Sequence, residues 1–190
     1  MNNMKKIILV AAAAILTISA NAQNKFAHVN FQELVQLAPE ADAARKTMNA
    51  SSQEAQETYQ AMVEELNTKY ATYQSKASTW TAAIRESKEK EITDVQQRIQ
   101  EFSQSIQVEL QQQQEQLMAP IYQKANEVVQ ELAKKGGYVY VFVINTMLYF
   151  DPAQSTDLTP EARKALGIAE DRTLEALAAE INAQSQAQQQ

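Results

Sequence analysis

Side chains that commonly do chemistry are scarce in this 190-residue chain, which has one histidine, no cysteine and three glycines. Without cysteine there is no disulfide framework, thiolate metal site or cysteine nucleophile. No motif places a nucleophile or base beside His28, so we interpret it as a packed strand residue. The spacing of Gly136, Gly137 and Gly167 fits no phosphate-binding loop. The sequence therefore predicts a protein that is not an enzyme and that holds no cofactor or metal.

Residues suited to binding gather between Leu66 and Ile92. This stretch carries five cations and three acids, although the formal charge of the whole chain is −6, which argues against nucleic acid as a partner. We expect the stretch to offer weak apolar and cationic contacts of the kind that suits an acidic partner. The residues expected to make these contacts are Trp80, Tyr70, Tyr73, Lys69, Lys76, Arg85, Lys88 and Lys90. Two plainer interpretations stay open: Trp80 packs over Tyr73 and Ile84, and the charges are solvated helix-surface pairs.

The N-terminus has the pattern of a secretory signal. Two lysines precede an uncharged run from Ile7 to Ala20, and small residues predict cleavage after Ala22. The run is shorter than the roughly 20 apolar residues of a membrane span. Removing residues 1–22 takes away two lysines and no acid, so the formal charge falls from −6 to −8. We expect an exported protein that is not integral to a membrane, and a contact with a membrane surface stays open.

Residues 39–119 are expected to form a long helical arm. Between Pro39 and Pro120 the chain has neither glycine nor proline and is rich in strong helix formers. Apolar residues recur at steps of three and four in both halves of this stretch, which is typical of a coiled-coil seam.

A reversal near Thr79 would let the two apolar stripes face each other. Facing positions would then sum to about 158, as Leu66 with Ile92 and Ser52 with Ile106 do. The hydroxyl and β-branched residues around Thr79 are also the poorest helix formers of the arm. Because heptad stripes repeat, the turn is fixed only to within about 3.5 residues. An unbroken rod that pairs with another molecule is the alternative.

The flanking residues 23–38 and 120–167 are expected to form a small β-rich body. A strand is predicted from Phe26 to Phe31, followed by a short helix that Asn30 caps with Glu33 three residues later. A helix on the return side should be broken or kinked at Pro120 and should stop at Lys134, Lys135 and Gly136.

Two further strands are predicted, at residues 138–145 and 147–150, and Asp151-Pro152 ends the second. Both faces of the first are apolar, and so small a body can hardly cover both, so we expect self-association. The residues expected in this oligomerisation body are Phe26, Val29, Val139, Val141, Val143 and Leu148. Residues 168–190 form an acidic, Gln-rich tail, with a short helix expected over 169–181 and disorder after it.

Both ends of the body resemble the Skp (OmpH-like) periplasmic chaperones. The similarity lies in Phe26–Glu40, in Ala133–Tyr138, and in Met147–Pro152 with Asp157–Thr159, and it spans about residues 24–167. It implies an α+β fold, in which a long antiparallel coiled-coil helical hairpin projects from a small β-strand body that trimerises into a barrel.

The resemblance also implies a function. Members are ATP-independent holdases, which bind unfolded outer-membrane β-barrel proteins in the periplasm and prevent their aggregation. Two features depart from the better-known members, because this chain is acidic and its tail extends past the usual end. No lipopolysaccharide site can be transferred residue by residue. The alternative function is a structural coiled-coil tether or spacer of the cell envelope that has no unfolded clients.

Overall fold

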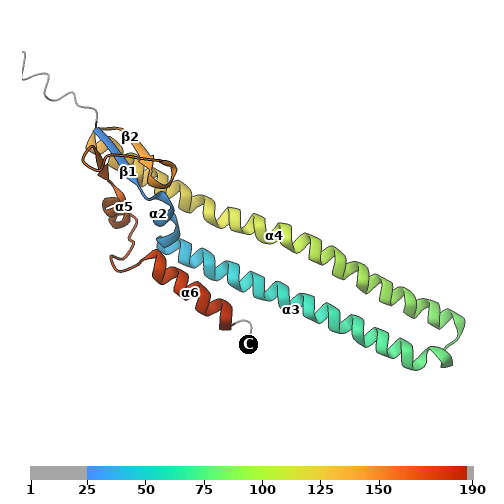
Figure 1. The fold of residues 1–190 in the computed structure, drawn as a ribbon. Coiled ribbons are helices and arrows are strands. Elements are labelled where there is room, and N and C mark those ends of the chain that lie inside the picture. Colours follow the sequence, from blue (N-terminus) through green and yellow to red (C-terminus); the bar gives the residue numbers. More distant parts are fainter. Residues whose placement is uncertain (1–24, 188–190) are drawn as a thin grey trace, which may run out of the picture. The chain divides into compact units, whose positions relative to one another are not determined.

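The computed structural model describes residues 25–187 (Figure 1). The predicted signal peptide, residues 1–22, lies outside the described residues, as does its cleavage site. The chain divides into two compact units, one of residues 38–123 and one of the described residues before and after them. The expected α+β fold, with two long helices and a small sheet, is confirmed. The elements are β1 (Lys25–Val29), α2 (Phe31–Leu37), α3 (Pro39–Lys76), η2 (Ala77–Thr79), α4 (Ala82–Gly136), β2 (Tyr138–Val143), η3 (Ile144–Thr146), β3 (Ser155–Asp157), α5 (Thr159–Ala165) and α6 (Leu174–Ala187).

The three strands form one parallel sheet in the order β2-β1-β3. The central strand β1 is the best buried, and Ala27 and Val29 expose at most 1% of their surface. Because partners in a parallel register share a face, Ala27 and Val29 lie on the same face as Val141 and Val143. The opposite face of β1 and β2 is aromatic. It carries Phe26, His28, Tyr140 and Phe142.

The third strand is not where the sequence predicted it. Residues 147–150 have strand-like composition but form no strand, and β3 is instead the polar segment Ser155–Asp157. Asp151 redirects the chain, because its carboxylate accepts a hydrogen bond from the Ala153 amide at 2.9 Å and its carbonyl accepts one from Gln154 at 3.0 Å. The turn brings Ser155, rather than the preceding apolar residues, into register with Phe26.

The predicted cap of α2 is confirmed. The Asn30 side-chain oxygen accepts a hydrogen bond from the Glu33 amide at 3.2 Å, and the Asn30 side-chain nitrogen donates to the Glu33 carboxylate at 3.0 Å. This pairing satisfies an otherwise unpaired amide of the first helical turn. The helix buries Leu34, Val35 and Leu37.

Of the break or kink expected at Pro120, the break is wrong, because α4 runs without interruption from Ala82 to Gly136 with Pro120 inside it. A proline in a helix removes one hydrogen bond and costs about 3 kcal/mol, which the long regular segments on both sides offset. The predicted stop at Lys134–Gly136 is confirmed. Gly137 follows with φ at +68°, a conformation that favours glycine, and its amide bonds to the Lys134 carbonyl at 3.2 Å.

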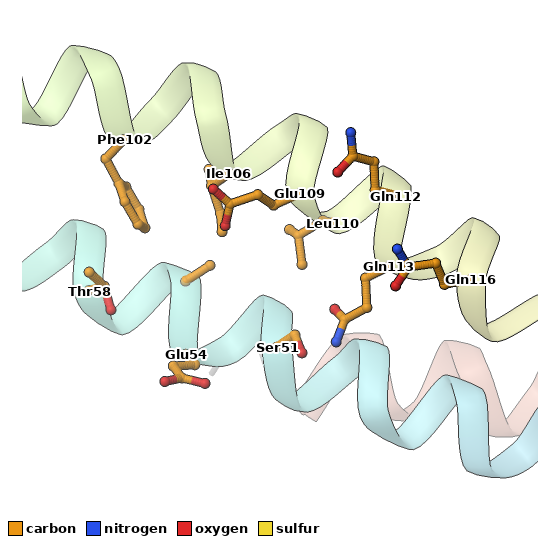
Figure 2. A pocket seen from close by; sticks show the side chains of 11 residues that line it. Ser51, Glu54, Thr58, Phe102, Ile106, Glu109, Leu110, Gln112, Gln113 and Gln116 are labelled. Carbon is orange, nitrogen blue, oxygen red and sulfur yellow. The ribbon is translucent and has the colours of Figure 1, made fainter.

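Within the unit of residues 38–123, α3 and α4 lie side by side as a helical hairpin (Figure 1). The alternative of an unbroken rod is therefore wrong. Ser51 and Ile106, whose positions sum to 157, lie along one opening between the helices, one residue from the expected pairing of Ser52 with Ile106 and within the range left open for the turn. We call this the shaft opening (Figure 2); its volume is about 460 Å³, and it is lined by Ser51, Ala55 and Thr58 of α3 and by Phe102, Ile106 and Leu110 of α4, among others.

The C-terminal segment holds two helices. Helix α5 was not predicted, and it ends in a glycine cap in which Gly167 has φ at +72° and the Ile168 amide bonds to the Arg163 carbonyl at 2.9 Å. Helix α6 begins later and ends later than the expected 169–181, since it runs from Leu174 to Ala187. The Thr173 hydroxyl caps its start by accepting a hydrogen bond from the Ala176 amide, and the residues after 181 are helical rather than disordered as far as Ala187. Leu177 of α6 is buried, so this helix is packed.

Candidate functional site

The turn of the hairpin is built by hydroxyl side chains. Helix α3 ends at Lys76, η2 follows, and Trp80 is extended before α4 begins at Ala82. The Thr79 hydroxyl donates to the Lys76 carbonyl at 2.8 Å, and the Thr81 hydroxyl accepts from the Ile84 amide at 3.4 Å. The break between the helices thus spans residues 77–81, which include Thr79.

Trp80 packs against the end of α3. Its ring meets that of Tyr73 edge-on, with centroids 5.9 Å apart and planes at 65°, and both side chains are half-buried. The predicted contact with Tyr73 is therefore present, whereas Ile84 remains 44% exposed. Trp80 closes the turn and still shows part of its ring to solvent.

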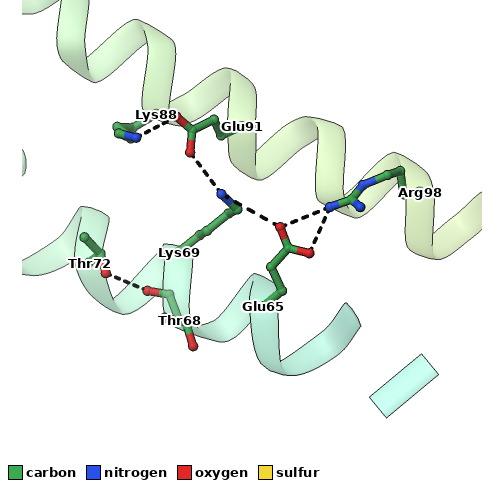
Figure 3. Close-up of polar contacts among 7 residues, drawn as sticks. All are labelled: Glu65, Thr68, Lys69, Thr72, Lys88, Glu91 and Arg98. Atoms are coloured by element: carbon green, nitrogen blue, oxygen red, sulfur yellow. Dashed lines mark hydrogen bonds and ion pairs between the residues drawn. The ribbon is translucent and has the colours of Figure 1, made fainter. Parts of the chain in front are cut away.

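Five charged side chains near the turn form a network between the two helices (Figure 3). Lys69 of α3 lies 2.9 Å from Glu91 and 3.8 Å from Glu65, and Lys88 lies 2.6 Å from Glu91. Arg98 of α4 donates to both carboxylate oxygens of Glu65, at 2.9 and 3.1 Å. The hydrogen bond from Lys88, and to a smaller extent the one from Lys69, lowers the pKa of Glu91. Lys69 and Arg98 thus join α3 to α4, whereas Lys88 pairs with Glu91 of its own helix.

The tyrosines of this region are also engaged within the hairpin. Tyr73 donates its hydroxyl hydrogen bond to Glu89, and this bond raises the pKa of Tyr73. The Tyr70 hydroxyl accepts a hydrogen bond from Gln96 at 2.8 Å, and Tyr70 is 39% exposed.

The remaining cations of the predicted set are Lys76, Arg85 and Lys90. All three are exposed, and none makes an ion pair within the part of the chain that the structure describes. The structure thus divides the predicted residues into a paired group and this exposed cationic group. Composition alone showed no difference between the two groups.

The sheet presents the second candidate surface. Of the residues predicted for it, Val29 is buried, Phe26, Val141 and Val143 are half-buried, Val139 is 51% exposed and Leu148 is fully exposed. Sequence reasoning missed its aromatic members, Tyr140, Phe142 and Tyr149, which are 59%, 42% and 83% exposed. Their signal was the apolar character of both faces of the strand. Because β2 lies at one edge of the described sheet, Tyr140 and Phe142 flank backbone groups that pair with no other described strand.

His28 is a packed strand residue, as predicted. Its Nδ1 lies 2.8 Å from the Ser155 hydroxyl, its Nε2 lies 4.0 Å from Asp157, and its ring packs against Phe150 at a tilt of 45°, with centroids 4.5 Å apart. Asp157 already accepts a hydrogen bond from the Thr159 amide at 2.8 Å. The three polar side chains thus join β1 to the segment around β3 and leave His28 only 7% exposed.

The described residues contain no cluster of three or more side chains that could hold a metal ion. Among the same residues, no helix combines the length and the hydrophobicity that crossing a membrane requires.

Comparisons with known proteins agree with one another. Residues 25–166 match the family model described as outer membrane protein (OmpH-like). The chain is 28% identical over 163 residues to the chaperone protein Skp of Yersinia enterocolitica, covering 85% of this chain and 98% of that protein. Its fold is similar, with a TM-score of 0.68 and 15% identity, to a crystal structure from Caulobacter crescentus assigned to the OmpH-like outer membrane chaperones, covering 80% of this chain and 90% of that one.

Proposed function

Because the chain belongs to the OmpH-like family of outer membrane proteins, whose members are chaperones and not enzymes, we propose that it is an ATP-independent holdase of the periplasm. Its clients are unfolded outer-membrane β-barrel proteins, which it binds and keeps from aggregating. The family match over residues 25–166 carries this proposal. The predicted signal peptide, cleaved after Ala22, would deliver the chain to the compartment that such clients cross.

We further propose that the working form is a homotrimer whose sheets join into a barrel. Three short strands make a poor independent sheet, since an open edge and an uncovered apolar face remain. Both features are present in the described chain, where β2 lies at the edge and Tyr140 and Phe142 are exposed on one face. The fully exposed Leu148 and the largely exposed Tyr149 supply further apolar area for a second copy.

A trimer also explains how binding without a chemical step can be useful. Each contact between a chaperone and an unfolded chain is weak and tolerant of sequence. Three hairpins in one assembly raise the effective concentration of such contacts, so a client is held without being fixed in one conformation. A client then leaves when a stronger binding partner competes for it.

The end of the hairpin is proposed as one client-binding surface. Lys76, Arg85 and Lys90 are exposed and carry no ion pair among the described residues, so they can meet acidic client segments. Trp80 and Tyr70 add partly exposed aromatic area beside them. Lys69 and Tyr73 support this surface by joining the two helices, and Lys88 pairs with Glu91, the same residue that Lys69 binds.

The test is to dilute a urea-unfolded outer-membrane β-barrel protein into buffer with and without the purified protein, in the absence of nucleotide. We expect light scattering to be suppressed and a soluble complex of one client per trimer to elute in size-exclusion chromatography. The same β-barrel protein, folded in detergent, is the control and should not bind. If the unfolded client aggregates unchanged while folded envelope proteins bind, the chain is a tether and the holdase proposal is wrong.

A further inference from the structure

The shaft opening is a place where the two helices of the hairpin do not fill the space between them. On the α4 side, Phe102, Ile106 and Leu110 point toward α3 and are only half-buried (Figure 2). On the α3 side the facing residues are small, Ser51, Ala55 and Thr58, so they cannot reach the large apolar side chains opposite. The result is an opening of about 460 Å³ in which these apolar side chains lie among polar ones, a size in the ordinary range of binding pockets.

The polar residues around this opening are of two kinds. Uncharged amides and hydroxyls come from Gln113 and Gln116, among others, and from Ser51 and Thr58. Such groups offer both donors and acceptors and therefore suit the amides and carbonyls of a peptide backbone. The charged groups at the rim are all carboxylates, from Glu54 and Glu109.

The surrounding helix segments have the same sign of charge. Residues 47–68 and 99–123 contain seven glutamates and no lysine, arginine or histidine. The intervening residues 69–98 contain six cations and four acids. The hairpin therefore carries opposite charge in its middle and at its end, which the formal charge of the whole chain conceals.

We propose that the shaft opening binds an apolar segment of a client polypeptide that carries lysine or arginine beside its apolar side chains. The apolar side chains enter against Phe102, Ile106 and Leu110, and the cations lie against Glu54 and Glu109. Acidic segments are repelled here and are left to the cationic end of the hairpin. This inference rests on the proposed function, since it names the class of client segment that one part of the hairpin accepts.

The experiment uses two fluorescently labelled peptides with the same run of leucine and phenylalanine, one flanked by lysines and the other by glutamates. Binding to the full-length protein is followed by fluorescence anisotropy. We expect the lysine peptide to bind at least about tenfold more tightly than the glutamate peptide. Raising the salt concentration should lower the affinity for the lysine peptide several-fold. Equal affinity for the two peptides would overturn the proposal.

Two pairs of variants locate the site. Ala55→Leu fills the opening, and its control, Ala61→Leu, makes the same change at an exposed position of the same helix. Filling the opening should lower the affinity for the lysine peptide by about tenfold, because one apolar side chain of the peptide can no longer be buried there. The control should change the affinity by no more than about twofold. Retained affinity in Ala55→Leu, with helicity confirmed by circular dichroism, would refute the assignment.

The second pair tests the charges. The double variant Glu54→Gln with Glu109→Gln should lower the affinity for the lysine peptide by about fivefold and make that affinity less dependent on salt. Glu57→Gln with Glu115→Gln removes the same charge from residues that do not line the opening, so it should have little effect. An equal loss in both double variants would show a diffuse charge effect and no site.

Aggregation assays separate this inference from the proposed function. If wild type suppresses client aggregation but binds neither peptide, the shaft opening is not a client site and the holdase function stands. If the lysine peptide binds as described but no unfolded client is protected, the opening is a peptide site and the holdase function is wrong.

Discussion

Replacing Tyr140 and Phe142 with lysine should convert the proposed trimer into monomers. The two rings lie on one face of β2 with centroids 5.9 Å apart, and Phe26 stacks on Tyr140 at 6.3 Å, so they form one aromatic surface. This surface is open to solvent in the single chain, where Tyr140 is 59% and Phe142 is 42% exposed.

The magnitude follows from the exposed area. An aromatic side chain carries about 150–250 Å² of surface, so the two residues leave about 200 Å² uncovered. Covering half of this at about 25 cal/mol per Å² contributes about 2.5 kcal/mol per chain. Three chains give about 7.5 kcal/mol, which is a factor of about 10⁵ in the assembly constant. Lysine also adds the cost of desolvating a charge in the interface.

The assay is sedimentation velocity or native mass spectrometry at fixed protein concentration, with helicity measured in parallel. A matched control is Tyr59→Lys with Val108→Lys, because these residues are 43% and 54% exposed but lie on α3 and α4. Wild type and control should sediment as trimers and the β2 variant as a monomer. A trimeric β2 variant, or a control that dissociates equally, would show that this surface does not hold the assembly together.

Four further outcomes are expected. Trp80→Ala should reduce suppression of client aggregation without loss of helicity, and unchanged suppression would remove Trp80 from the client surface. The pKa of Glu91 is lowered in the folded protein, so its lysine contacts stabilise the fold above its ordinary pKa of 4.5, and this stabilisation is lost as the pH falls through the folded value. Glu91→Gln should therefore have a lower melting temperature than wild type near neutral pH and the same melting temperature in strong acid. Gly137→Ala should cost about 1–2 kcal/mol in urea unfolding, because alanine is strained at its positive φ, and Gly137→Asn should cost less. Asn30→Ala should cost about 1 kcal/mol through loss of the α2 cap, and Asn30→Ser should restore most of it.

Elements with strong local signals were predictable from the sequence. The cap of α2 needs only two residues three positions apart, and the long helices follow from eighty residues free of glycine and proline. Strand β3 carries no such signal, because Ser155, Thr156 and Asp157 are polar and pair only when the turn at Asp151 presents them to β1. Local composition favoured residues 147–150, and tertiary pairing overrode it.

The candidate surfaces were predictable only as composition. A count of cations located the end of the hairpin, but whether Lys69 or Lys76 has a partner depends on which residues face each other across the helices. Heptad stripes leave that register open by several residues. The shaft opening was missed for the same reason, since it exists only where Ser51 and Ala55, and not larger neighbours, face Ile106 and Leu110.

The seam between α3 and α4 is well filled near the ion network and poorly filled at the shaft opening, and this difference affects both stability and binding. Beside the ion network, Ile92 and Val95 are buried, whereas Phe102 and Ile106 further along α4 are only half-buried. Each methylene added from the α3 side would contribute about 0.8 kcal/mol if it were buried, so Ala55 keeps the hairpin below the stability that a filled seam would give it. The apolar surface that the hairpin leaves unburied is the surface that a client can cover, because a seam that buried all of its own apolar surface would leave none for a client. The ion pairs between Lys69 and Glu91 and between Arg98 and Glu65 hold the helices together away from the shaft opening, so they leave its apolar side chains to a client segment.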